Sequence, residues 1–206
     1  MKITLTKTGK RFNRDWIFRN LSYEFLAGQS YAIIGPNGSG KSTLLQLIAG
    51  SIGWSEGTVD YLSPDAKPIA SEQAYQFIAM AAPYLELIEE MTLTEFLTFH
   101  QNFKPFMDSL SMKDVMSKVN LTDASHKQIR YFSSGMKQRV KLAQAIFSDT
   151  PVILLDEPCT NLDQDGVVLY QQLMKEHSSD RLCIVSSNDI QEYDFCDHHI
   201  EVLKYK

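Results

Sequence analysis

Short runs of consecutive apolar residues alternate along the chain with segments in which apolar and polar positions follow a regular period. The runs 31–34 and 152–155 are continuously apolar, which is typical of strands buried on both faces of a parallel sheet. Residues 2–7 and 21–26 read as antiparallel strands, with a turn at 27–29. The pattern predicts strands at 2–7, 21–26, 30–34, 58–62, 152–155, 182–186 and 198–203, and helices at 41–49, 164–176 and 189–193.

The middle segment 84–134 has a different, helical character. Thr92 and Glu95 have the spacing of a capping box, and apolar residues follow on one helical face. Ser111 is a candidate start for a second helix. We therefore predict one α/β domain with a mostly parallel central sheet, an N-terminal antiparallel piece and a short helical subdomain. Residues 1–83 and 135–206 form the predicted core, and 84–134 the inserted subdomain.

A glycine-rich motif stands between the predicted strand 30–34 and the helix that follows it. Its spacing, G-x-x-x-x-G-K-[ST], is that of a phosphate-binding loop, in which backbone N–H groups and a helix N-terminus surround an anion. Lys41 is then placed for the β- and γ-phosphates, and Ser42 for Mg²⁺. The alternative is a flexible glycine turn. We predict a protein that binds a nucleoside triphosphate and Mg²⁺ through Gly35, Pro36, Asn37, Gly38, Ser39, Gly40, Lys41, Ser42 and Thr43.

Two carboxylates follow the buried strand 152–155. Ligands bind at the carboxyl ends of strands in parallel sheets, so Asp156 is placed to hold Mg²⁺ or its water. Glu157 comes one residue later, on the other side of the strand, and could polarise an attacking water as the catalytic base. Pro158 ends the strand. Without the loop at 35–43, the same residues could be a strand followed by an acidic turn.

A third motif, Phe132–Arg139, precedes a helix with an apolar face. Together with 35–43 and Asp156–Glu157, this order of motifs resembles the ATP-binding cassette (ABC) ATPases over nearly the whole chain. The resemblance implies that Ser133 and Gly135 contact the γ-phosphate bound by a partner subunit, so that two ATP molecules lie between two cassettes. Alone, Ser133 or Ser134 would be a plain helix cap.

The resemblance also implies further site residues. Phe12, 29 residues before Lys41, occupies the position of an aromatic residue that stacks on adenine. Asn188 stands where the family has a catalytic switch histidine, and an amide cannot take up a proton as imidazole does. No glutamine is found around Ala82–Pro83, where the family has one. These departures predict firm ATP binding with slow or partner-dependent hydrolysis.

Composition narrows the class of partners. The 206 residues carry a net charge of −5 without a run of basic residues, so nucleic acid is not an expected partner. Three cysteines without C-x-x-C spacing give no disulfide framework. The N-terminus lacks the apolar core of a signal peptide, and no window is apolar enough to span a bilayer. We expect a cytoplasmic protein held at the membrane by a separately encoded permease.

Two further patterns have ordinary explanations. Cys196–His199 looks like a metal cluster, but adjacent residues of a strand point to opposite faces, so His198 and His199 cannot easily share an ion. The acidic run at 86–90 is a solvated face, although the family meets its membrane partner there.

The expected function is the ATPase subunit of a two-component ABC transporter, acting as a homodimer or heterodimer. The alternatives are an ATP-binding regulatory subunit with little turnover and a soluble ABC protein outside transport.

Overall fold

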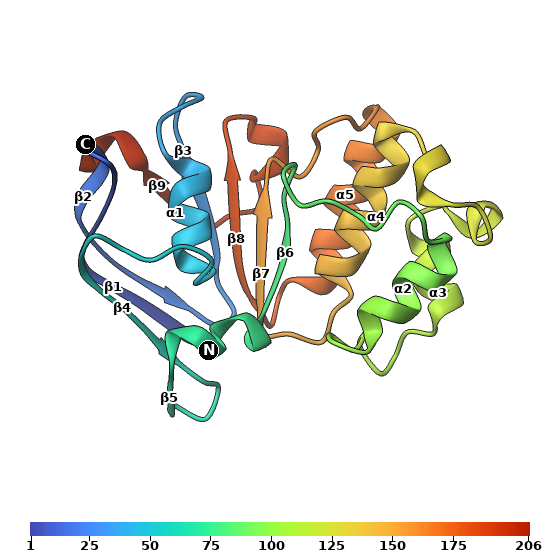
Figure 1. Cartoon of the computed structure of the whole chain (residues 1–206), viewed down its shortest axis with the longest axis horizontal. Coiled ribbons are helices and arrows are strands. Elements are labelled where there is room, and N and C mark those ends of the chain that lie inside the picture. The colour runs from blue at the N-terminus through green and yellow to red at the C-terminus, as the bar shows by residue number, and fades with distance from the viewer.

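The computed structural model describes residues 1–206, which form two sheets with helices between and beside them (Figure 1). The first sheet is antiparallel, in the order β2-β1-β4-β5, and the second is parallel, in the order β6-β7-β8-β3-β9. The predicted architecture, a mostly parallel central sheet with an N-terminal antiparallel piece, is confirmed. The strands are β1 (Lys2–Phe12), β2 (Asp15–Leu26), β3 (Ser30–Ile34), β4 (Glu56–Leu62), β5 (Pro68–Ile69), β6 (Ile78–Ala81), β7 (Val152–Asp156), β8 (Leu182–Ser187) and β9 (His198–Glu201).

The parallel sheet has an apolar core on each face. Strand β7 is buried along its whole length, as its continuous apolar sequence predicted. Ile153 and Leu155 belong to the core under the helices, whereas Val152 and Leu154 belong to the core that faces the antiparallel sheet. Successive side chains of a strand point to opposite faces, so one strand joins both cores. The carboxyl end of β7 is therefore held firmly from both sides.

The antiparallel sheet is larger than the sequence predicted. Strand β1 continues to Phe12, and β2 already begins at Asp15. A tight turn joins the two strands, and in it Asn13 has a φ of +54°. The predicted strands 2–7 and 21–26 missed this extension because the register shifts repeatedly beyond Leu5, which removes the regular alternation. The C-terminal end also differs from the predicted strand 198–203. Strand β9 stops at Glu201, and Val202–Tyr205 forms a 3₁₀ turn.

Helices cover both faces of the parallel sheet. Figure 1 shows α1 between the two sheets and the other helices on the far side of the parallel sheet. In the middle segment, Thr92 and Ser111 form the N-terminal capping boxes of α2 and α3. The predicted helix 189–193 is a 3₁₀ turn at Ile190–Glu192. The helices are α1 (Lys41–Ile48), α2 (Leu93–Gln101), α3 (Met112–Lys118), α4 (Ser134–Ile146) and α5 (Gln164–His177).

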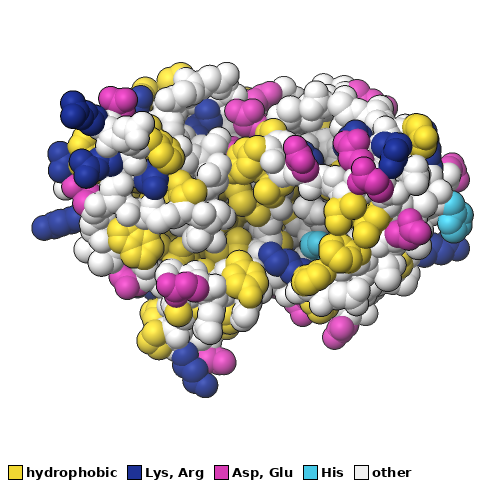
Figure 2. All heavy atoms as spheres, in the orientation of Figure 1, with side chains coloured by type: hydrophobic (Ala, Val, Ile, Leu, Met, Phe, Trp, Pro, Cys, Tyr) yellow, Lys and Arg dark blue, Asp and Glu magenta, His cyan; other side chains and the backbone are white.

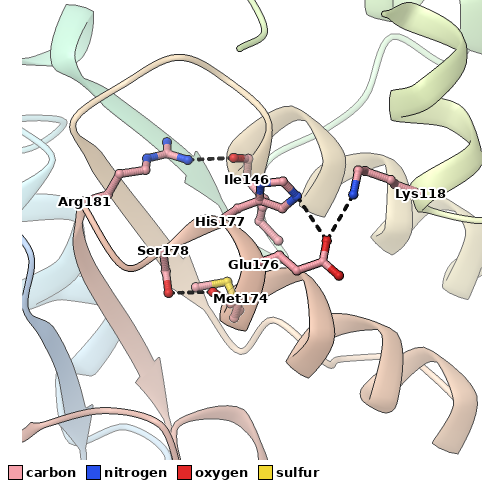
Figure 3. A network of polar contacts seen from close by, with 7 residues as sticks. All are labelled: Lys118, Ile146, Met174, Glu176, His177, Ser178 and Arg181. Atoms are coloured by element: carbon pink, nitrogen blue, oxygen red, sulfur yellow. Dashed lines mark hydrogen bonds and ion pairs between the residues drawn. The ribbon is translucent and has the colours of Figure 1, made fainter. Parts of the chain in front are cut away.

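A buried arginine connects the start of β8 to the chain between α4 and β7. Arg181 donates hydrogen bonds to the carbonyl oxygens of Ile146, Ser148 and Thr150, at 2.6, 3.0 and 2.6 Å. Burial lowers the pKa of this guanidinium to about 10. Figure 3 shows Arg181 in a network near His177 and near the ion pair of Glu176 with Lys118, which joins α5 to α3.

Replacing Arg181 should strongly destabilise the fold. Arg181→Met removes the donors of three buried carbonyl groups, and leaving such groups without partners costs about 3 kcal/mol or more in total. We expect a loss of that size in the free energy of unfolding, measured by urea denaturation. Arg14→Met, at an exposed turn position, is the matched control and should leave stability nearly unchanged. Equal stability of the two variants would contradict the structural role of Arg181.

Candidate functional site

The loop between β3 and α1 has a backbone shape that requires glycine. Gly38 and Gly40 have φ values of +75° and +106°, a region that other residues rarely adopt. A Cβ atom on Gly40 would lie 2.4 Å from Cγ2 of Ile17, so the two segments meet closely there. Gly40 is also the N-cap of α1, so the loop presents the free N–H groups of the helix start. This arrangement is suited to an anion.

Lys41 folds its side chain back over this loop. The residue is 5% exposed, and its Nζ donates a hydrogen bond of 2.9 Å to the carbonyl oxygen of Gly35. The ammonium group is thus held above the backbone that would surround an anion. A bound phosphate offers a stronger, charged acceptor than a carbonyl oxygen, so the same group can shift to it without leaving the loop.

The loop opens into a hollow of about 240 Å³. Sequence analysis anticipated most of its lining, including Glu157, but it missed Ile17. Ile17 comes from β2, whose start lies beyond the predicted strand. The hollow therefore combines polar groups of the loop with one apolar side chain from the antiparallel sheet. The lining residues are Ile17, Asn37, Gly38, Gly40, Lys41, Ser42, Thr43 and Glu157.

Asp156 is a buried carboxylate with unused bonding capacity. It is 1% exposed, and its Oδ1 atom has no hydrogen-bond partner. The hydroxyl of Ser186, on the neighbouring strand and paired in register with Asp156, also has none. A buried unpaired carboxylate oxygen is costly, and Mg²⁺ prefers oxygen ligands. The donors present therefore fit a magnesium ion, with Asp156 and Ser42 as the residues that would hold it.

Glu157 stands in a strained turn rather than in the strand. Strand β7 ends at Asp156, and Glu157 has a φ of +43°. Its N–H donates to the carbonyl oxygen of Ser186 at 2.8 Å, which anchors the turn. The expected placement across the strand from Asp156 is thus replaced by a turn that directs Glu157 to the hollow. Such a conformation costs about 1–3 kcal/mol in a residue other than glycine.

Asn188 lies beside the loop although 151 residues separate it from Asn37. Its Nδ2 atom donates a hydrogen bond of 3.3 Å to Asn37 Oδ1. Asn188 directly follows β8, which pairs in parallel with β3, so both strand ends reach the same edge. The structure therefore brings together Lys41, Glu157 and Asn188, the three residues predicted to be catalytic, around one loop.

Tyr84 is a residue of this edge that sequence analysis missed. It follows β6, the neighbour of β7, close to Asp156 and to Gln46 of α1. Burial raises the pKa of the Tyr84 phenol, and the charge of Asp156 raises it further. The phenol thus stays protonated near the end of β7. It lies next to Ala82–Pro83, where the glutamine of the family is absent.

Ser133 and Gly135 do not line the hollow formed by loop 35–43. Ser133 caps α4 by accepting a hydrogen bond of 3.2 Å from the N–H of Met136, so the simple capping role is present. A Cβ on Gly135 would lie 3.0 Å from the carbonyl oxygen of Asn161. In Figure 1 the start of α4 and the β3–α1 loop lie at the same edge of the molecule, on either side of β7 and β8. One chain therefore presents two separate polar sites along one edge.

Phe12 lies at the end of β1, next to the hairpin turn. Its ring is 49% exposed, and Lys10 Nζ lies 4.9 Å from the ring centroid. The same hairpin carries Ile17, which lines the hollow. Stacking of Phe12 on a base stays a prediction.

The structure agrees with both ordinary interpretations made from the sequence, for the two histidines and for the acidic run. His198 stacks on Tyr31 and His199 contacts Tyr193, so the two rings occupy different surroundings, as adjacent strand residues should. The acidic run is a solvated face, as expected: the Glu90 side chain is 74% exposed, and that of Glu89, which pairs with Lys137 at 2.5 Å, is 46% exposed. Glu90 lies 3.8 Å from Arg130.

All three cysteines are free, and no helix has the length and apolar character needed to cross a bilayer.

The fold and the loop define a P-loop nucleotide-binding protein of the cassette type. The sequence profile of the family described as ABC transporter matches residues 18–160, and the chain belongs to this family. It is 30% identical to an uncharacterized ABC transporter ATP-binding protein of Bacillus subtilis, over 94% of this chain and 88% of the relative. It is 33% identical to a cytochrome c biogenesis ATP-binding export protein of Rhizobium etli, over 86% of this chain and 83% of the relative.

Solved structures agree with the fold. A putative ABC transporter ATP-binding protein of Pyrococcus furiosus superposes with a TM-score of 0.84 at 19% identity, with full coverage of both chains. A dimeric bacterial ABC transporter cassette gives a TM-score of 0.80 at 21% identity, covering 98% of this chain and 95% of the other. At these identities the likeness shows the fold.

Proposed function

We propose that two copies of the chain, or one copy and a related subunit, close around two ATP molecules and hydrolyse them to drive a separate membrane permease. The observation that carries this proposal is the separation of the two polar sites on one edge. Loop 35–43 and the start of α4 lie apart in one chain, whereas a two-fold arrangement would place the α4 start of each subunit opposite the loop of the other. Ser133 and Gly135 would then complete the ATP site in trans.

Each residue has a distinct task in the proposed reaction. Lys41 and the loop N–H groups bind the β- and γ-phosphates, and Phe12 stacks on the adenine. Ser42 and Asp156 would hold Mg²⁺, whose charge offsets that of the phosphates when it is bound. Glu157 accepts a proton from the attacking water, and Asn188 donates a hydrogen bond to the γ-phosphate. Strain at Glu157 supports this assignment, because its backbone conformation directs the carboxylate to the hollow.

A groove on another side of the molecule is the proposed docking site of the permease. Its hollow of about 290 Å³ lies between the parallel sheet and α2, where Figure 2 shows apolar side chains gathered around a central depression. Three aromatic residues in or near it, Tyr75, Phe99 and Phe103, are 60%, 41% and 71% exposed. Exposed aromatic clusters of this kind mark interaction sites. A segment of the permease would bury them, and residues 84–134 would form the subdomain that moves with it.

The dimer model is tested by measuring mass in solution. In a Glu157→Gln variant, which blocks hydrolysis, saturating Mg-ATP should convert a monomer into a dimer, as followed by light scattering. The double variant Glu157→Gln/Lys41→Ala, which cannot bind ATP, should stay monomeric. A monomer in the Glu157→Gln variant at saturating Mg-ATP would contradict the proposal.

Variants of Asn188 test whether the protein is an efficient or a slow ATPase. If the missing imidazole limits turnover, Asn188→His should raise kcat about tenfold, or about 1.4 kcal/mol, with little change in ATP affinity. Such a gain is within the range of one hydrogen bond to a developing charge. If the amide already serves fully, Asn188→His should change kcat little. Asn188→Ala should then impair turnover severely. Measuring kcat for both variants distinguishes an active ATPase from a regulatory subunit with low turnover.

A further inference from the structure

Glu192 is a buried carboxylate that the proposed reaction does not use. It is 5% exposed and lies in the 3₁₀ turn Ile190–Glu192, shortly after Asn188. None of the ion pairs in the structure includes it. A buried charge without an ion-pair partner depends on hydrogen bonds for its stability. The groups that hydrogen-bond to Glu192 therefore indicate why a carboxylate is buried at this position.

One oxygen of Glu192 is bonded to the segment that follows β7. The backbone N–H of Cys159 donates to Glu192 Oε1 at 2.7 Å. Cys159 begins the segment 159–163, which also contains Asn161, the residue whose carbonyl oxygen approaches Gly135. A charge-assisted hydrogen bond in a buried setting is stronger than a bond between neutral groups. Glu192 thus holds in place the segment next to the start of α4.

The turn that carries Glu192 is also bonded back to Asn188 and its neighbours. The N–H of Asp189 donates to Ser187 Oγ at 2.9 Å, and the N–H of Glu192 donates to the carbonyl oxygen of Asp189 at 3.1 Å. Asn188, between Ser187 and Asp189, contacts Asn37 of the phosphate-binding loop. Hydrogen bonds at both ends and the short chain segment 188–192 between them therefore connect loop 35–43 with segment 159–163.

The surroundings of Glu192 and Cys159 also affect the pKa values of these two side chains. Burial raises the pKa of the Glu192 carboxyl group, and hydrogen bonds from Ser187 and from the Cys159 N–H oppose that rise. Burial, followed by the charge of Glu192, raises the pKa of the Cys159 thiol. The thiol therefore stays protonated, and Cys159 takes part through its backbone N–H.

We propose that Glu192 is a positioning residue that couples the state of the nucleotide at loop 35–43 to segment 159–163. The inference rests on the proposed function, because it requires ATP at that loop. A γ-phosphate that engages Asn188 shifts the turn 190–192, and Glu192 transmits the shift to the N–H of Cys159. Segment 159–163 lies beside Gly135, so the shift changes the surface that faces the partner subunit.

Hydrogen exchange of the full chain tests this coupling. Peptides covering 35–43 and 158–164 are followed by mass spectrometry with and without Mg-ATP, in a Glu157→Gln parent that does not consume the nucleotide. ATP should slow exchange at both peptides in the parent. Adding Glu192→Ala should abolish the ATP effect at 158–164 and leave it intact at 35–43. Glu192→Gln keeps an acceptor oxygen and should restore the effect at 158–164.

Two further variants sharpen the test. Glu192→Asp withdraws the carboxylate by one methylene, so it should act like Glu192→Ala if the latter does not fold. Tyr170→Phe removes a different bond to the same turn, the 2.7 Å hydrogen bond from Tyr170 Oη to the carbonyl oxygen of Glu192. This matched control should keep the ATP effect at both peptides.

The outcomes separate the inference from the function on which it rests. An ATP effect at 158–164 that survives in both Glu192→Ala and Glu192→Asp overturns the role of Glu192. The same conclusion follows if Tyr170→Phe abolishes the effect as fully as Glu192→Ala. If ATP leaves 35–43 unprotected in the parent, the proposed function fails and the coupling fails with it.

Discussion

Lys41→Ala should abolish ATP binding. The ammonium group of Lys41 is buried above the phosphate-binding loop, and it is the mobile cation that can shift from a backbone carbonyl to the phosphates. Losing a charged hydrogen bond to an anion of this kind costs about 3 kcal/mol, so affinity should fall by about a hundredfold or more. Titration with a fluorescent ATP analogue measures this change directly.

A control variant distinguishes the local effect from a general change of charge. Lys204 is exposed and pairs with Glu201 near the end of the chain, so Lys204→Ala should bind ATP normally. Thermal unfolding of both variants checks that the fold is retained. Unchanged nucleotide affinity in Lys41→Ala would refute the assignment of the loop.

Glu157→Gln should nearly eliminate turnover while preserving ATP binding. The amide has the shape of the carboxylate but cannot accept a proton from water, and loss of a general base lowers rates by about 10²–10⁴-fold. Phosphate release under saturating Mg-ATP gives kcat, and the titration described for Lys41 gives affinity. A fall in kcat without a matching loss of affinity is the signature of a group that acts during the reaction.

The matched control is Glu24→Gln on β2, where the carboxylate is half exposed and pairs with Lys2. Its kcat should equal that of the unmodified protein. A Glu157→Gln variant that keeps at least a third of the normal kcat would show that another group takes the proton. The Asp156 carboxylate would then be the first alternative to examine.

Local sequence signals predicted the parts of the structure that depend on neighbouring residues. The capping box at Thr92 formed as expected, and the helix start predicted at Ser111 is also a capping box, because a cap requires only two side chains three residues apart. The buried strand β7 was recognisable from four consecutive apolar residues. Loop 35–43 was recognisable for the same reason, since its glycines and lysine lie in one short motif.

Features that depend on distant contacts were not predictable in this way. Ile17 reaches the hollow only because β2 extends past a shifted register, and Tyr84 approaches Asp156 only because β6 and β7 are paired. Glu192 is similar, since its partner Cys159 lies 33 residues away. Each of these contacts is set by sheet order, which the periodicity of one strand does not contain. The roles assigned to the predicted site residues themselves remain predictions.

The position of β7 between two apolar cores determines which mutations endanger the catalytic edge. Its side chains pack into the core beneath the helices on one face and into the core toward the antiparallel sheet on the other. A cavity made in either core can displace the strand end that carries Asp156, even when no residue near the nucleotide has changed. Inactivating substitutions should therefore be found deep in both cores, whereas the exposed rim around the loop should accept more sequence variation.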